Sequence, residues 1–319
     1  MALLEIDNLG IGFPTAAGMA EVVRGLSLSV ETGEAVGLVG ESGSGKSQTA
    51  LAIMRLLRAP GRITRGSIRL DGHDIGRLDE REMRRLRGGT VSIVFQDALS
   101  GLNPVFPIGV QISDVIRAHR TVSQRDARNI AVEMLELVGI KDAGKRLDAY
   151  PHEFSGGMRQ RVLIAMAVAC RPKLLIADEP TTALDVTVQA QIVELLRDLR
   201  EKLGLALLFI THNLDLMSEI CSRSVVLYGG MMMEDSPVDM LFGRPEHPYS
   251  KALLDCVPRL EDRPGDLKPI EGAAFSLARA GQGCPFVARC ALADDRCETE
   301  RPPELRRGGH RIACWKAAA

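Results

Sequence analysis

Eight consecutive residues near the N-terminus have the types and spacing that bind phosphate groups. They run from Gly40 to Ser47 and read GESGSGKS, which matches the pattern GxxxxGK[ST]. A strand-like run (35–39) precedes them and a helical pattern (48–57) follows, which is the order of elements that this loop requires. Glycines let backbone N–H groups point at phosphate oxygens, and the N-terminus of the next helix adds a positive dipole. The pattern predicts a site for a nucleoside triphosphate with Mg²⁺.

The side chains of this loop are expected to have two different roles. Lys46 supplies a positive charge to the β- and γ-phosphates, and Ser47 supplies a hydroxyl oxygen to Mg²⁺. The residues predicted to contact the nucleotide are Gly40, Ser42, Gly43, Ser44, Gly45, Lys46, Ser47 and Gln48.

Two carboxylates follow a second apolar run, where open α/β sheets place their ligands. Residues 174–177 read LLIA, and Asp178 and Glu179 come directly after them. Asp178 is expected to hold Mg²⁺, directly or through a water. Glu179 is the candidate general base, which would polarise the water that attacks the γ-phosphate. Together with the phosphate loop, this pair indicates hydrolysis of the nucleotide.

Strand-like runs alternate with helical patterns along much of the chain, which is typical of an α/β fold. The strand-like runs are 3–6, 26–30, 35–39, 91–95, 174–177, 205–210 and 224–227. Apolar residues at helical spacing occupy 110–119, 124–138 and 158–170. We therefore expect a P-loop NTPase core at 1–232 with a mixed, largely parallel sheet and an inserted helical subdomain at about 98–171. Prolines interrupt the remaining residues, so 233–319 are predicted to form a loop-rich C-terminal extension.

Composition and charge exclude several kinds of partner. Hydrophobic residues make up 45% of the 319 residues, and the formal net charge is −1. The chain has no stripe of Lys and Arg, so nucleic acid is not an expected partner. The longest apolar run, 205–210, is far shorter than the roughly 20 residues of a membrane-spanning helix. The N-terminal residues carry no export signal, which favours the cytosol.

The segment 154–161, which reads FSGGMRQR, resembles the signature of the ABC ATPase family, usually written LSGGQ. In that family the signature contacts ATP held by the opposite subunit. The resemblance therefore implies that Ser155, Gly156 and Gly157 bind the nucleotide of a partner ATPase, through backbone N–H groups and a helix dipole. Phe154 and Met158 depart from the common form, which leaves open any contact made by the family's Gln side chain.

Other residues match further motifs of the same family. Gln96 is similar to the Q-loop glutamine, which implies a role near Mg²⁺ and the attacking water. His212 is similar to the switch histidine, which implies contact with the γ-phosphate and orientation of Glu179. Asp185 ends the sequence TALD, which resembles the D-loop at the dimer interface. Phe13 is the candidate for the family's adenine-stacking aromatic residue.

Four of the seven cysteines gather near the C-terminus, at Cys284, Cys290, Cys297 and Cys314. With HPY at 247–249, this extension resembles the dipeptide and oligopeptide branch of ABC importers, and nickel importers share much of the pattern. The resemblance implies a [4Fe–4S] cluster on the four cysteines. From the residues alone, the wide gaps lack the short CxxC units of structural zinc sites, yet four thiolates suit iron–sulfur or Zn²⁺. Free thiols are the third alternative.

The resemblance implies the ATP-binding and ATP-hydrolysing subunit of an ABC importer that takes up dipeptides or oligopeptides. Its partners would be a second ABC ATPase subunit, either a paralogue or a second copy, and two transmembrane permease subunits. An extracytoplasmic solute-binding protein would be engaged indirectly. The expected location is the cytoplasmic face of the cell membrane, where the subunit is peripheral.

Three alternatives compete with this interpretation. The same role for nickel or another small solute fits the same motifs. A soluble ABC-type ATPase acting on nucleic acid would usually carry a long coiled coil or two motif sets, and the chain has neither. A P-loop kinase or GTPase would explain Lys46 and Asp178, but it would leave Gln96 and His212 without a role.

Overall fold

The computed structural model describes residues 2–16, 18–96, 101–182, 184–257, 269–277 and 281–317. The chain divides into two compact units. Unit 1 comprises Met1–Leu3, Val30–Glu34 and Asp71–Phe209, and unit 2 comprises Leu4–Ser29, Ala35–Leu70 and Ile210–Ala319. The described helices include none that is long and apolar enough to cross a membrane.

The sheet of unit 1 is built on a parallel pair of buried strands. Strand β6 (Val91–Val94) runs parallel to β7 (Leu174–Asp178), with Val91 opposite Leu174 and Val94 opposite Ala177. All five residues of β7 are buried, as expected of a parallel strand that is covered on both faces. Strand β8 (Ala206–Thr211) is next in the sheet order, and its first four residues belong to unit 1.

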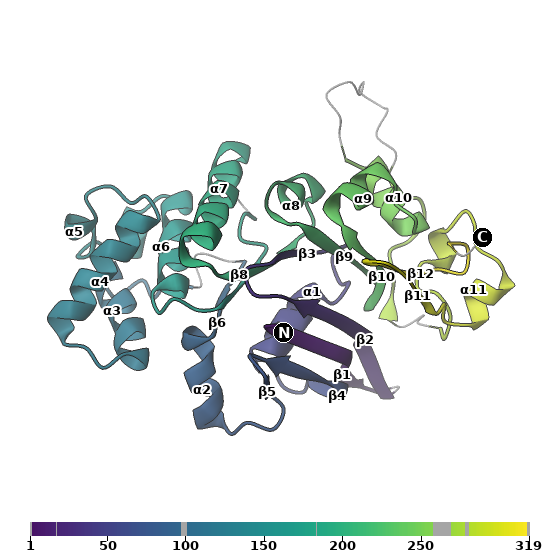
Figure 1. The fold of residues 1–319 in the computed structure, drawn as a ribbon, viewed down its shortest axis with the longest axis horizontal. Helices are drawn as coiled ribbons and strands as arrows, with labels where there is room; N and C mark the ends of the chain where they lie inside the picture. The colour runs from purple at the N-terminus through teal and green to yellow at the C-terminus, as the bar shows by residue number, and fades with distance from the viewer. Residues whose placement is uncertain are drawn as a thin grey trace. The chain divides into compact units, whose positions relative to one another are not determined.

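Helices make up most of the rest of unit 1. They are α2 (Glu80–Gly89), α3 (Ile108–His119), α4 (Gln124–Leu137), α5 (Ala143–Arg146), α6 (Gly156–Val168) and α7 (Val186–Leu203), with a short 3₁₀ turn at Pro151–Glu153 and a two-residue strand β5 (His73–Asp74). Figure 1 shows α3, α4, α5 and α6 gathered together: α4 contacts each of the other three, and α3 also contacts α6. The apolar faces buried there include Ile112 and Ile116 of α3 and Leu135 of α4. The three predicted helical patterns are thus confirmed, although residue 98, where the subdomain was predicted to begin, lies outside the described residues.

Unit 2 contains an antiparallel sheet in the order β2–β1–β4. Its strands are β1 (Leu4–Thr15), β2 (Gly18–Val30, of which Val30 belongs to unit 1) and β4 (Arg62–Leu70). Leu4 faces Leu70 and Ile6 faces Ile68 across the β1–β4 pair, so apolar residues share one face of the sheet. The sequence did not suggest a strand at β4, because its first five residues, RITRG, include two arginines, a threonine and a glycine, and all five are exposed.

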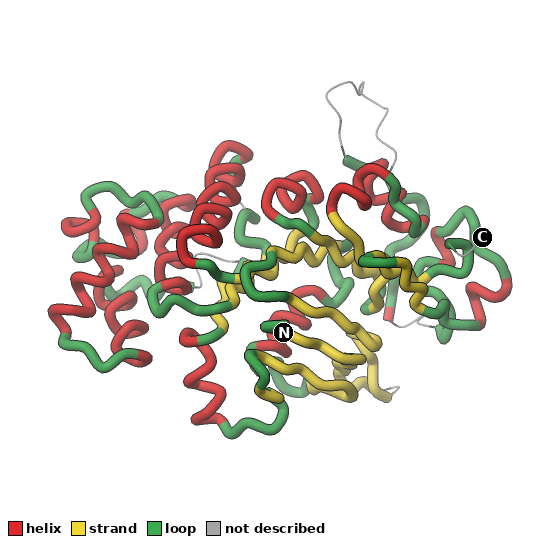
Figure 2. Tube along the Cα trace, viewed as in Figure 1, coloured by secondary structure: helices red, strands yellow, loops and turns green. Residues whose placement is uncertain are grey.

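A second sheet in unit 2 joins the phosphate-loop strand to the C-terminal region (strands yellow in Figure 2). Strand β3 (Ala35–Val39) pairs in parallel with β9 (Arg223–Tyr228), and antiparallel pairs then add β10 (Met231–Pro237), β12 (His310–Ala313) and β11 (Glu304–Arg307). The helices of unit 2 are α1 (Lys46–Ile53), α8 (Leu214–Ile220), α9 (Val238–Gly243), α10 (Pro248–Asp255) and α11 (Asp295–Thr299), with a 3₁₀ turn at Val287–Arg289. The region predicted to be loop-rich (233–319) therefore contributes β11, β12 and most of β10 to this sheet, where β12 pairs with β10 and β11 pairs with β12.

A buried carboxylate ties together four segments of unit 2. Asp235 on β10 is 2% exposed and accepts hydrogen bonds from Arg223 Nη1 (3.0 Å) and from Arg311 Nε (3.0 Å). The same two guanidinium groups donate to the carbonyl oxygens of Ser29 and Ser27. Charge-assisted hydrogen bonds of this kind hold their partners in fixed geometry. Asp235 therefore anchors the last strands of the chain to the end of β2.

Replacing Asp235 by alanine is expected to lower the free energy of unfolding by roughly 3 kcal/mol, because two part-buried guanidinium groups would lose their shared carboxylate. Urea denaturation followed by circular dichroism measures this loss. The matched control is Asp198→Ala, which removes an exposed pair with Lys202 on α7 (3.2 Å) and should cost less than about 1 kcal/mol. Equal losses in the two variants would contradict the anchoring role.

Candidate functional site

The phosphate loop lies in unit 2, between the buried strand β3 and helix α1. Two of its glycines are required by close contacts as well as by backbone conformation. A Cβ atom on Gly40 (φ 149°) would lie 2.1 Å from the carbonyl oxygen of Leu227, and one on Gly45 (φ 99°) would lie 2.8 Å from that of Val22. No other residue type fits these two positions, because L-residues rarely adopt such φ values and their side chains would clash.

The loop curls around the ammonium group of Lys46, which is 5% exposed. Lys46 Nζ donates to the carbonyl oxygens of Gly40 (2.7 Å) and Glu41 (3.0 Å) and lies 3.4 Å from Ser44 Oγ. Lys46 also begins α1, whose first turn, described in full, carries no acidic side chain. Ammonium, helix N-terminus and glycine-rich backbone thus coincide at one place, which is what binding of a phosphate anion requires.

The two carboxylates lie at the end of β7 in unit 1. Asp178 is buried at 6% exposure, and Glu179 is half-buried with φ 48°. This left-handed conformation is uncommon for a residue other than glycine, and such conformations concentrate at functional sites. The chain therefore turns sharply at Glu179 as it leaves the strand.

Glu179 is held by two side-chain hydrogen bonds. Its Oε2 accepts from Gln96 Nε2 (3.1 Å) and from Thr182 Oγ1 (3.0 Å). Gln96 is 83 positions away in the chain, but it follows β6, and the parallel register of β6 and β7 brings the ends of the two strands together. The sequence motifs named Gln96 and Glu179 separately, and the structure brings them into contact. Thr182 begins the TALD sequence, but no role is predicted for it from the sequence. Its hydrogen bond to Glu179 depends on the shape of the turn between the two residues, which the sequence pattern does not show.

The signature segment lies at the N-terminus of α6, and the D-loop residue Asp185 lies at the N-terminus of the neighbouring helix α7. Ser155 caps α6 by accepting from Met158 N–H (3.3 Å), and Asp185 caps α7 by accepting from Val188 N–H (3.0 Å). A Cβ atom on Gly157 would lie 2.7 Å from Val188 Cγ1, so glycine allows α6 to approach α7 closely. The glycines thus have a packing role beside the predicted one. Ala183 of the TALD sequence lies outside the described residues.

The remaining predicted residues, His212 and Phe13, belong to unit 2. His212 is exposed directly after β8, and the next residue, Asn213, caps α8 by accepting from Leu216 N–H (3.2 Å). Phe13 is a half-buried residue of β1, and its ring packs against Gly61, where an added Cβ atom would lie 2.5 Å from ring atom Cε1. Adenine stacking by Phe13 and a γ-phosphate contact by His212 stay predictions.

The four C-terminal cysteines line one cavity in unit 2, together with His247 and Phe286. None of the seven cysteines of the chain forms a disulfide. Burial raises the pKa of Cys284 to about 11 and lowers that of His247 to about 4, as expected for groups in apolar surroundings. Three of the four sulfurs accept a hydrogen bond from a backbone N–H group two residues later in the chain. The donors to Cys284, Cys290 and Cys314 are Phe286, Leu292 and Lys316, in that order. Within the described part of the chain, no three His, Cys, Asp or Glu side chains are grouped so as to hold a metal ion.

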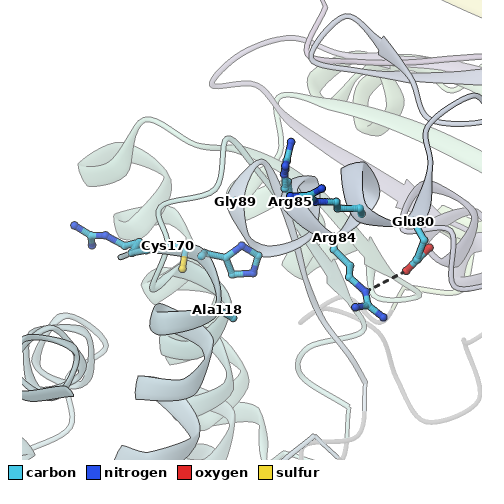
Figure 3. A pocket seen from close by; sticks show the side chains of 9 residues that line it. Glu80, Arg84, Arg85, Gly89, Ala118 and Cys170 are labelled. Carbon is cyan, nitrogen blue, oxygen red and sulfur yellow. Dashed lines mark ion pairs between the residues drawn. The ribbon is translucent and has the colours of Figure 1, made fainter. Parts of the chain in front are cut away.

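A separate hollow of about 600 Å³ lies in unit 1 between α2, the end of α3 and Cys170 (Figure 3). Four arginines and one carboxylate line it, and Arg84 Nε lies 3.8 Å from Glu80 Oε1, the pair dashed in Figure 3. None of the predicted site residues lines this hollow, so its positive charge is unrelated to the nucleotide motifs.

Comparison with known proteins agrees with these features. Residues 23–182 match the family described as ABC transporter, and residues 233–297 match the oligopeptide/dipeptide transporter, C-terminal region. The chain is 46% identical to the oligopeptide transport ATP-binding protein OppD of Salmonella typhimurium, over 98% of this chain and 93% of that protein. It is 43% identical to the dipeptide transport ATP-binding protein DppD of Bacillus subtilis, over 98% and 94%. In structure it is similar to a dimeric ATP-binding cassette bound to ADP and Pi, with a TM-score of 0.66 and 26% identity over 74% of this chain and 98% of that chain.

The fold and the phosphate loop define an ABC-type P-loop ATPase cassette, as predicted. The chain belongs to the ABC transporter ATP-binding family, and it carries the C-terminal region of that family's oligopeptide and dipeptide branch. It is an ATPase subunit that binds ATP with Mg²⁺.

Replacing Glu179 by glutamine is expected to leave ATP affinity within about twofold and to lower phosphate release by at least about 100-fold, because a general base contributes that much. Equilibrium nucleotide binding and a phosphate-release assay measure the two effects. Glu194→Gln, the same change at an exposed position of α7, should alter neither. If Glu179→Gln kept most of the activity, Glu179 would not be the base.

Proposed function

We propose that this chain is the ATP-hydrolysing subunit of a peptide importer. One observation carries the proposal: the chain matches oligopeptide and dipeptide transport ATP-binding proteins along nearly its whole length and theirs. Within that match, the phosphate loop curls around Lys46, and Glu179 is oriented by Gln96. The residues for ATP hydrolysis and the C-terminal region of peptide transporters therefore occur in one chain.

ATP binding and hydrolysis are proposed to take place between two such subunits. Lys46 and Ser47 of one subunit hold the triphosphate and Mg²⁺, with Asp178 and Gln96 completing the metal site. Ser155 and Gly157 of the opposite subunit approach the γ-phosphate with the N-terminus of α6, whose backbone N–H groups suit an anion. A closed pair that binds ATP more tightly than an open pair converts this difference in affinity into movement of the membrane partners.

Glu179 has the surroundings that a general base needs in this scheme. Its carboxylate is held by two donors from different segments, so a water positioned beside it would meet a fixed acceptor. Gln96 contacts that carboxylate directly, so a movement of the Q-loop would change the base as well as the metal site. His212 follows β8 at an exposed strand end, where it is proposed to meet the γ-phosphate.

The partners follow from the importer role. Membership of this branch of ABC importers implies that the chain works with transmembrane permease subunits. We propose two of them, together with a second ABC ATPase subunit that is a paralogue or a second copy and a solute-binding protein engaged indirectly. The proposed location is peripheral, on the cytoplasmic face of the membrane, because ATP is consumed there.

The cysteine cavity is proposed to hold a [4Fe–4S] cluster. Four thiols that converge on one apolar cavity, with backbone N–H groups at three sulfurs, suit a cluster whose corners each need one thiolate. Zn²⁺ is the alternative occupant of this cavity, since four thiolates also suit that ion. Cys284, Cys290, Cys297 and Cys314 would be the ligands, and a bound cluster would supply a redox-active or structural centre there.

The importer role is tested by purifying the tagged chain from membranes of its own host. Two permease subunits should copurify, and the complex in liposomes should hydrolyse ATP several-fold faster when a peptide-loaded binding protein is supplied. The same complex given nickel chelates is the comparison. Stimulation by a nickel chelate and not by peptides would replace the substrate, and recovery without any permease would reject the importer role.

Anaerobically purified protein is expected to be brown and to contain about four irons and four sulfides per chain. Cys284→Ser should lower the iron content and the visible absorbance, because a cluster loses one of its ligands. Cys256→Ser, which changes a half-buried cysteine outside the cavity, should leave both unchanged. Zinc in place of iron, or no metal at all, would contradict the cluster.

A further inference from the structure

Glu41, the second residue of the phosphate loop, is contacted by the C-terminal extension. Its backbone N–H donates to Tyr249 Oη (2.9 Å), and its two carboxylate oxygens accept from Arg289 Nη1 (2.9 and 2.8 Å). Its carbonyl oxygen accepts from Lys46 Nζ (3.0 Å), the charge that is predicted to bind phosphate. All four residues belong to unit 2. Glu41 therefore links the phosphate-binding lysine to two residues that lie more than 200 positions later in the chain.

Arg289 is a fixed anchor rather than a mobile surface charge. Its side chain is only 6% exposed. Besides Glu41, its guanidinium group donates to Tyr228 Oη (3.1 Å) and to the carbonyl oxygens of Ile270 (2.9 Å) and Glu271 (3.1 Å). A planar guanidinium with partners on several sides has one orientation available. The carboxylate of Glu41 is therefore held in one orientation as well.

Tyr249 is equally fixed. It is fully buried, and its ring packs against those of Tyr228 (centroids 4.5 Å apart) and Phe286 (5.2 Å). Tyrosine is protonated at neutral pH, and burial raises the pKa of Tyr249 further, so its hydroxyl accepts the Glu41 N–H as a neutral group. This gives the HPY sequence at 247–249 a physical role, because its tyrosine reaches the phosphate loop.

The ion pair between Arg289 and Glu41 also removes a net negative charge from the phosphate loop. A carboxylate beside a triphosphate site repels the ligand, and the repulsion is strong where water is partly excluded. Arg289 neutralises Glu41 with two charge-assisted hydrogen bonds. Without this guanidinium, the Glu41 side chain would be a negative charge in the loop that must receive a polyanion.

We propose that Arg289 and Tyr249 are positioning residues for ATP binding: through Glu41 they hold the phosphate loop in the shape that presents Lys46 to the triphosphate. The inference rests on the proposed role of this loop in binding ATP, and it makes the C-terminal extension a determinant of nucleotide affinity. Arg289 also directly precedes Cys290, so a backbone movement at the cysteine cavity would reach the phosphate loop through one side chain.

The test is equilibrium binding of a fluorescent methylanthraniloyl ATP to the full chain. Arg289→Gln should weaken binding about tenfold, because a charge-assisted pair is broken and a carboxylate is left beside the ligand. Arg289→Lys, which keeps the charge, should recover part of the loss. Tyr249→Phe should weaken binding about threefold, since it removes one neutral hydrogen bond. In steady-state ATPase assays the KM for ATP should rise while kcat changes little.

Arg311→Gln is the matched control, because it also removes a part-buried arginine of the extension that is paired with a carboxylate. Among the described residues, its guanidinium group contacts Asp235, Glu304 and the carbonyl oxygen of Ser27, and not the phosphate loop. It should lower thermal stability and leave ATP affinity unchanged. In the double variant Glu41→Gln/Arg289→Gln, removal of both charges should restore part of the affinity lost in Arg289→Gln.

Wild-type affinity in Arg289→Gln, or an equal loss in Arg311→Gln, would overturn the inference. If Arg289→Gln does not fold, Arg289→Lys and Tyr249→Phe decide in its place, and wild-type affinity in both would overturn it as well. Wild-type protein and Lys46→Ala separate this outcome from a failure of the proposed function. If wild-type protein does not bind the nucleotide, or Lys46→Ala binds it equally well, the assignment of the ATP site itself is wrong.

Discussion

A triphosphate is held where positive charge and backbone N–H groups are fixed at one place, and the proposed place in this chain is the loop around Lys46. The ammonium group is buried and bonded to two carbonyl oxygens of its own loop. Gly40 and Gly45 pass within contact distance of the backbone at Leu227 and Val22. The shape of the loop thus depends on the strands beside it, and the packing of unit 2 serves this one constraint.

The C-terminal region is part of that packing. Strands β10 and β12 extend the sheet that contains β3, and Asp235 fastens them through Arg223 and Arg311. The same region supplies the side chains that contact Glu41. The C-terminal region therefore contacts the core of unit 2 in two ways, through the sheet and through the phosphate loop.

Several residues of unit 1 have a structural role beside the chemical role proposed for them. Ser155 and Asp185 cap the N-termini of α6 and α7, a position that serine and aspartate favour. Gly157 allows the close approach of α6 and α7. Gln96 and Glu179 meet because parallel strands end at the same edge of a sheet. The site in this unit is thus a consequence of helix capping and strand register.

The sequence by itself determined the fold class, the phosphate loop, the carboxylates and the helical patterns, because each depends on residues within one short segment. The sequence GESGSGKS predicts a phosphate-binding loop, and the apolar runs predict strands. Only the tertiary structure decided which distant residues meet: Gln96 with Glu179, and Arg289 and Tyr249 with Glu41. No local pattern marks Glu41 or Arg289, since a single glutamate and a single arginine are ordinary surface residues until packing buries the pair. Strand pairing and burial act between segments far apart in the chain, and they set these contacts.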